Sequence, residues 1–61
     1  MNNNIVSGSN PNGEFYEIKK DGFHYLVQRN RHGLWFAYIN CLVQDIDLPN
    51  QNAALAWLNR Q

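Results

Sequence analysis

Residues 14–39, EFYEIKKDGFHYLVQRNRHGLWFAYI, contain the strongest secondary-structure pattern in the chain. Three runs rich in aromatic and β-branched residues are separated there by polar residues. Asp21 and Gly22 separate the first two runs, and this dipeptide is a strong hairpin signal because a type I′ turn needs positive φ at both central positions. The polar residues 30–33, which end in a glycine, separate the second run from the third. The stretch therefore predicts a three-stranded antiparallel meander.

Turn lengths assign the side chains of this meander to two faces. A two-residue turn at 21–22 pairs Tyr16 with Val27 and places both on one face. A four-residue second loop, 30–33, adds Phe36 to that face and puts Trp35 on the opposite one. A five-residue loop exchanges Trp35 for Phe36, because a shift of one residue turns every side chain of a strand over. The register of the third strand is therefore open between these two alternatives.

The N-terminal residues 1–13, MNNNIVSGSNPNG, contain five Asn, two Ser, two Gly and one Pro. Such a segment buries too little apolar surface to offset the conformational entropy lost on ordering. We expect a flexible N-terminal tail over 1–13 and a single domain over 14–61. The alternative is that Ile5 and Val6 begin a short edge strand.

Residues 41–48, CLVQDIDL, allow two interpretations. They extend the third strand past a bend, or they form a short fourth strand with Val43 and Ile46 pointing inward. Neither pattern is strong enough to decide between them.

The last residues predict a helix over 51–60, since alanines of high helix propensity follow Pro49 and the side chain of Asn50 or Asn52 is available as an N-cap. Three turns of helix are marginal alone, so we expect it to dock on the sheet. The docking residues are expected to be Leu55, Trp57 and Leu58. The fold class is therefore α+β, with a three-stranded meander, a possible short fourth strand and one C-terminal helix, in the order βββα.

Composition excludes several classes of protein. The chain has 61 residues, five basic and five acidic residues, and one cysteine. A single cysteine forms no intramolecular disulfide and no cysteine-based zinc site. The longest apolar runs, 34–39 and 53–58, are too short to cross a membrane, and the N-terminus does not resemble a signal peptide. We expect a cytoplasmic protein without a metal or another cofactor.

Acid–base chemistry has two candidate pairs, His24 with Glu17 and Asp45 with Asp47. In the predicted register Glu17 faces Leu26 and has His24 diagonal to it, which favours a solvated cross-strand pair. A domain of this size is too small to enclose a substrate, and a buried, apolar role is expected for the cysteine. The sequence therefore predicts a protein that is not an enzyme and takes no small-molecule substrate.

With one helix on one face and a four-residue second loop, the other face of the sheet is left with a set of exposed apolar side chains. Exposed apolar patches of this kind mark binding surfaces, and aromatic residues dominate binding hot spots. We therefore predict a small accessory or regulatory module that binds a partner protein or forms a homodimer. The candidate protein-binding residues are Phe15, Leu26, Trp35, Ala37 and Ile39.

The alternative function is DNA or RNA binding through basic residues at the turns. The zero net charge opposes it, because such binding depends on a basic excess. The two turns of a meander also lie at opposite ends of the sheet, which dilutes any patch. The candidate residues for this alternative are Lys19, Lys20, Arg29 and Arg31.

The order of strands followed by a helix resembles that of small sheet-plus-helix modules, among them the arm-binding domains of phage integrases. The resemblance covers the order of elements and a helix that ends Ala-Leu-Ala-Trp-Leu, so it implies no site residues. A small accessory protein of the kind that phages and mobile elements encode fits this size.

Overall fold

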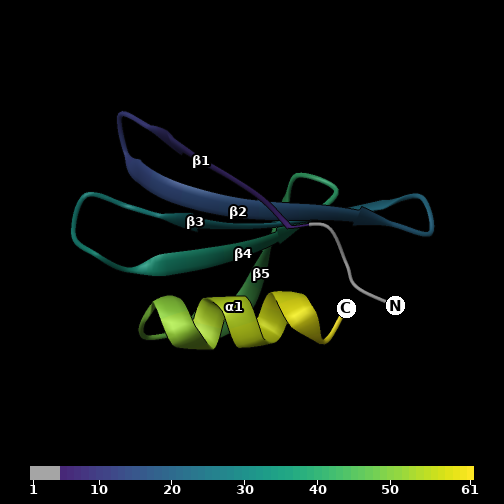
Figure 1. The fold of residues 1–61 in the computed structure, drawn as a ribbon. Helices are drawn as coiled ribbons and strands as arrows, with labels where there is room; N and C mark the ends of the chain where they lie inside the picture. Colours follow the sequence, from purple (N-terminus) through teal and green to yellow (C-terminus); the bar gives the residue numbers. More distant parts are fainter. Residues whose placement is uncertain (1–4) are drawn as a thin grey trace.

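The computed structural model describes residues 5–61 and shows one five-stranded antiparallel sheet with a helix packed against it (Figure 1). The strands lie in the sheet in the order of the chain. The α+β class and the C-terminal helix are confirmed, but there are five strands where three or four were predicted. The elements are β1 (Val6–Asn10), β2 (Gly13–Lys20), β3 (Phe23–Arg29), β4 (Trp35–Ile39), β5 (Leu42–Leu48) and α1 (Gln51–Asn59).

Strand β1 corrects the prediction of a tail over residues 1–13 and agrees with the edge-strand alternative. It pairs with β2 from Val6, opposite Glu17, to Asn10, opposite Gly13. The Asn10 side chain holds the connecting turn, because its Oδ1 accepts hydrogen bonds from the backbone N–H of Asn12 (3.0 Å) and of Gly13 (3.2 Å). Every residue of β1 is exposed, so backbone pairing rather than burial holds the strand in place. Residues 1–4 of the predicted tail lie outside the described residues.

The hairpin between β2 and β3 has the predicted register, with Lys20 opposite Phe23 and Tyr16 opposite Val27. Its turn residues Asp21 and Gly22 have φ of 53° and 81°. Both values are positive, as a type I′ turn requires.

The loop between β3 and β4 has five residues, 30–34, so Arg29 lies opposite Trp35 and Val27 opposite Ala37. Asn30 closes this loop, since its N–H donates to the carbonyl of Leu34 (2.8 Å) and its Oδ1 accepts from the Leu34 N–H (3.0 Å). Leu34 is thereby held in the loop and is 52% exposed. The four-residue register is wrong, and the five-residue alternative is the one observed.

A second two-residue turn joins β4 to β5. Asn40 and Cys41 have φ of 51° and 70°, and Ile39 pairs with Leu42. The Asn40 Oδ1 also accepts a hydrogen bond from the backbone N–H of His24 (2.9 Å), which ties the turn to β3. Cys41 is exposed, so its predicted burial is wrong.

Strand β5 settles the two interpretations of residues 41–48 in favour of a separate strand, but the predicted inward residues are wrong. Val43 is 60% exposed and Ile46 is 38% exposed, whereas Leu48 is 5% exposed and belongs to the core. The register between β4 and β5 is irregular between Trp35 and Ala37. This irregularity allows Leu48 to reach the covered side of the sheet, opposite Trp35.

Helix α1 begins after Asn50, whose Oδ1 accepts a hydrogen bond from the Ala53 N–H (2.9 Å) as an N-cap. The helix is fastened to β2 at both ends. Gln51 Nε2 donates to the Tyr16 hydroxyl (2.7 Å), and Lys20 Nζ donates to the carbonyl of Gln61 (2.8 Å).

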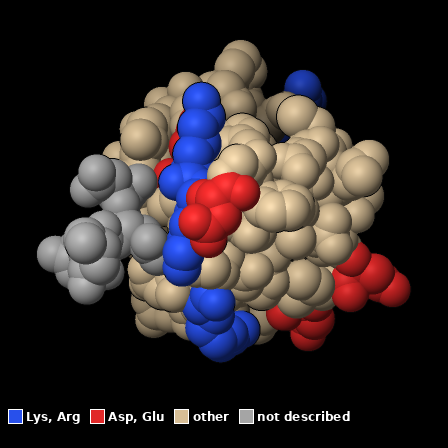
Figure 2. Space-filling model, turned by 90° about the vertical axis from the view of Figure 1, so that its right-hand side faces the viewer, with Lys and Arg blue, Asp and Glu red and all other residues tan. Residues whose placement is uncertain are grey.

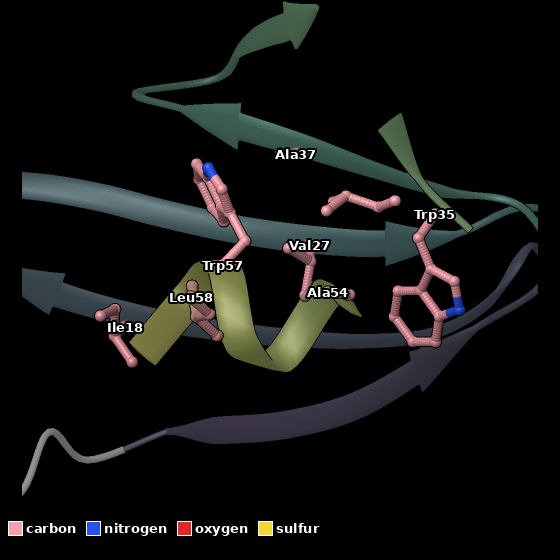
Figure 3. Close-up of a cluster of buried hydrophobic side chains, with 8 residues drawn as sticks. Ile18, Val27, Trp35, Ala37, Ala54, Trp57 and Leu58 are labelled. Carbon is pink, nitrogen blue, oxygen red and sulfur yellow. The ribbon is translucent and has the colours of Figure 1, made fainter. Parts of the chain in front are cut away.

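The core lies between the helix and one face of the sheet, where Trp57 and Leu58 of α1 point onto the strands (Figure 3). Tyr16 stacks on Trp35 with ring centroids 5.9 Å apart, and Trp57 meets Tyr25 edge-on at 6.3 Å. Two of the three predicted docking residues, Trp57 and Leu58, are buried, and Leu55 is half-buried. The buried hydrophobic residues are Ile18, Val27, Trp35, Ala37, Leu48, Ala54, Trp57 and Leu58.

Candidate binding face

The strand register divides the sheet into a covered face under α1 and a second face, which we call the open face. Directly opposed residues of antiparallel strands have their side chains on the same face. Two rows of such residues cross the open face, and no other element among residues 5–61 packs against them. One row is Val6, Glu17, Leu26, Tyr38 and Val43, and the other is Gly8, Phe15, Gln28 and Phe36.

Apolar side chains dominate both rows. Phe36 is 38% exposed and Val43 is 60% exposed, although each has large neighbours on the adjacent strand. Phe15, Leu26 and Tyr38 are half-buried, and Leu26 on β3 lies directly opposite Tyr38 on β4. The open face therefore carries aromatic and branched side chains from four adjacent strands, with Glu17 and Gln28 among them.

The Phe15 ring extends this surface over β1. A Cβ atom built on Gly8 would lie 2.6 Å from Cζ of Phe15, closer than real Cβ contacts come. The ring therefore lies directly over the glycine backbone, the arrangement by which an aromatic residue covers a glycine in a neighbouring strand. A side chain at position 8 would therefore have to displace the Phe15 ring.

Several polar side chains on the open face already have hydrogen-bond partners within the fold. His24 Nε2 and Glu17 Oε1 are 2.8 Å apart, with the two side chains 30% and 27% exposed. Asn10 Nδ2 donates to Gln28 Oε1 (2.8 Å), and Gln28 Nε2 donates to the carbonyl of Arg29 (2.6 Å). Covering these groups with a partner costs less than covering unpaired groups would, because their hydrogen bonds are already made.

The His24–Glu17 contact confirms the predicted diagonal pair, one of the two candidates for acid–base chemistry. It lies on the face of the sheet rather than in a deep cleft. A hollow of about 310 Å³ is lined by Val6, Glu17, Ile18 and Lys19, and it is open to solvent along one side. The other candidate pair, Asp45 and Asp47, is exposed on β5.

The predicted set of protein-binding residues is divided between the two faces. Phe15 and Leu26 lie on the open face as predicted. Trp35 is 5% exposed and Ala37 is fully buried on the covered face, and Ile39 packs against the same core. The placement of these three on an exposed face is wrong, because it depended on the four-residue loop. Phe36, Tyr38 and Val43 occupy the open face in their stead.

The basic residues of the alternative function are not brought together. Lys19 and Lys20 precede the β2–β3 turn, and Arg29 and Arg31 lie at the opposite end of the sheet. The end with the β2–β3 turn shows a narrow band of Lys and Arg side chains with an acidic side chain beside it (Figure 2). Arg29 forms an ion pair within the chain, since its Nε lies 3.6 Å from Glu14 Oε1, and this Nε is buried.

Two further structural features bear on function. Within residues 5–61 no group of three or more His, Cys, Asp and Glu side chains is placed to hold a metal ion. In the same part of the chain no helix is long and apolar enough to cross a membrane.

Comparisons with known proteins add no family to this description. No protein-family model, no curated protein and no solved structure matches the chain.

Proposed function

We propose that this chain is a small protein-binding module whose binding surface is the open face of its sheet. The observation that carries the proposal is the exposure of Phe36 and Val43 on the face that also carries Phe15, Leu26 and Tyr38. Aromatic side chains at the centre of a patch are typical of binding hot spots. The partner expected from this chemistry is a protein with an apolar patch of its own.

The mutual pairing of the polar groups supports the same proposal. The one acidic group in the rows, Glu17, is matched by His24, and Gln28 is held by Asn10. A partner that covers the two rows therefore removes no unpaired carboxylate from water, and burying an unpaired charge is the costly event at an interface.

The experiment compares two lysine substitutions in immobilised protein exposed to an extract of cells that encode the chain. Phe36→Lys places a charge on the open face, at its most exposed aromatic side chain. Leu34→Lys is the matched control, because Leu34 is also large, apolar and exposed but lies in the β3–β4 loop. We expect the wild type and Leu34→Lys to retain the same protein, and Phe36→Lys to lose it.

The captured protein is then purified and titrated against each variant by calorimetry. Phe36→Lys is expected to weaken binding by at least about tenfold, the loss of one hot-spot contact. Circular dichroism and thermal unfolding establish that both variants are folded. Undiminished binding by a folded Phe36→Lys variant contradicts the proposal.

Nucleic-acid binding through Lys19, Lys20, Arg29 and Arg31 is the second hypothesis, and its support is weaker because these residues lie at two ends of the sheet. It predicts that mixed-sequence DNA or RNA oligonucleotides bind at low salt with an affinity that falls steeply as salt rises. Fluorescence anisotropy with labelled oligonucleotides tests it, and the absence of binding at low salt removes it.

A further inference from the structure

The two edge strands of the sheet differ in how they are protected against pairing with another chain. Natural sheets blunt their edges with charges, prolines, bulges or irregular register. Strand β5 has such devices, since it carries Asp45 and Asp47 and its register with β4 is irregular. Strand β1, VSGSN, has no charged residue and no proline, pairs regularly with β2 and is exposed throughout. The β1 edge is therefore the unprotected one.

The direction of the backbone groups of β1 follows from the hairpins. Lys20 and Phe23 close the two-residue turn and therefore form a hydrogen-bonded pair, as does every second pair from there. Tyr16 is one of these, so its backbone groups point to β3. Phe15 and Glu17 alternate with it and direct their N–H and C=O groups to β1.

On β1, Gly8 and Val6 are the partners of these two residues and receive their hydrogen bonds. Ser7 and Ser9 alternate with them, so their N–H and C=O groups point away from β2, and none of residues 5–61 lies beyond that edge as a strand. Three consecutive residues, Ser7, Gly8 and Ser9, thus present a short, uncharged template for a further strand.

We propose that this edge pairs with β1 of a second copy of the chain, antiparallel about a twofold axis at Gly8. Ser7 of each copy then lies opposite Ser9 of the other and exchanges two backbone hydrogen bonds with it. Gly8 lies opposite its own counterpart in a pair without hydrogen bonds. The two sheets become one continuous sheet with an isologous interface.

The glycine on the axis gives this arrangement a second contact. Residues paired without hydrogen bonds approach to about 4.5 Å between Cα atoms. Because the Phe15 ring of each copy lies over its own Gly8, the two rings meet across the axis on the open face. The apolar surface of one copy thereby continues into that of the other.

Charge favours a second copy as the occupant of this edge. The chain has no net charge, and β1 itself has no charged side chain, so two copies approach without repulsion. The interface uses an edge of the sheet and leaves the Phe36 region free. It therefore goes beyond the proposed binding function and does not depend on it.

The experiment measures the mass of the full chain by sedimentation equilibrium over a range of concentrations, with two double variants that differ in one charge. Ser7→Lys with Ser9→Lys places lysine opposite lysine in the proposed register, and Ser7→Lys with Ser9→Glu places lysine opposite glutamate. Both serines are exposed in the single chain, so neither change disturbs the core. Opposed like charges destabilise a strand pair and opposite charges stabilise it.

We expect the wild type to approach twice 7.1 kDa as its concentration rises. We expect the dimer dissociation constant of the lysine–lysine variant to be at least about tenfold higher than that of the wild type. The lysine–glutamate variant is expected to remain a dimer. A wild type that stays monomeric up to about 1 mM, or two variants that behave alike, overturns the proposal.

Phe36→Lys separates this proposal from the binding function of the open face. The Phe36→Lys variant is expected to dimerise with the same dissociation constant as the wild type but to lose partner capture. Loss of the dimer in Phe36→Lys together with a dimeric lysine–lysine variant would place the contact between open faces and overturn the edge pairing. Backbone amide dispersion in NMR spectra shows that each variant is folded.

Discussion

The covered and open faces of the sheet are built from similar residues but have different roles. On β4, Trp35 and Ala37 are buried beneath α1, while their sequence neighbours Phe36 and Tyr38 lie on the open face. None of the buried residues of the covered face is polar or charged among residues 5–61, whereas the open face carries paired polar groups such as Glu17 and His24. Register rather than hydrophobicity therefore decides which aromatic residues make the core and which remain available to a partner.

The largest expected difference between the faces is in the stability lost when two adjacent residues, Trp35 and Phe36, are replaced by alanine. Trp35→Ala is expected to cost about 3–5 kcal/mol, because it removes a buried indole that stacks on Tyr16. Phe36→Ala is expected to cost about 1 kcal/mol, because the Phe36 side chain is already partly hydrated. Urea unfolding followed by circular dichroism measures both.

A chain of this length has a total stability of about 3–9 kcal/mol, so Trp35→Ala is expected to lose its cooperative transition while Phe36→Ala keeps it. Equal destabilisation by the two substitutions would contradict the division of β4 between a covered and an open face.

The stability of helix α1, which covers one face of the sheet, is expected to depend on its N-cap, Asn50. Asn50→Ala removes the acceptor for the Ala53 N–H and is expected to lower the stability of the domain by about 1 kcal/mol. Asn52→Ala, two residues further on within the helix, is the control and is expected to have no effect or a slightly stabilising one, since alanine has the higher helix propensity. Thermal unfolding compares the two, and an equal loss of stability would show that the cap does not fasten the covering layer.

The β4–β5 turn fixes which β5 side chains join the open face. Cys41 has φ of 70°, a conformation that glycine adopts more readily than any residue with a Cβ. Cys41→Gly creates Asn-Gly, the preferred type I′ pair, and is expected to raise stability by about 0.5–1 kcal/mol. Urea unfolding under reducing conditions measures the change, and a loss of stability would show that the side chain itself contributes.

The smallest change in stability is expected for a substitution on the open face. Glu17→Gln keeps the size of the side chain and removes the charge from the contact with His24. Partly exposed pairs of this kind contribute little, so the stability at pH 7 is expected to change by no more than about 1 kcal/mol. A larger loss in the unfolding curve would show that the open face also stabilises the fold, which would weaken its assignment as a surface kept for a partner.

Local chemistry explains the parts of the fold that the sequence predicted. The β2–β3 turn follows from Asp21 and Gly22, and the start of α1 follows from Asn50, because each signal acts through backbone groups only a few residues away. Two asparagines act in the same way without having been assigned this role. Asn10 holds the β1–β2 turn and Asn40 ties the β4–β5 turn to β3.

The prediction for β1 failed for a different reason. Its composition indicates little burial, and it has little, since all of its residues are exposed. What orders the strand is the free edge of β2, a template that is formed by residues later in the chain. A pattern in residues 1–13 alone does not contain that edge.

The class of the fold, the first hairpin, the capped helix and the zero net charge follow from the sequence, since they depend on local backbone chemistry and on composition. The face on which Trp35 and Phe36 lie depends on tertiary contacts. Residues 34–39 are apolar throughout, so they have no two-residue period to choose a register. The choice came from the Asn30–Leu34 hydrogen bonds and from the helix, which packs over the small side chain of Ala37 and leaves Phe36 outside.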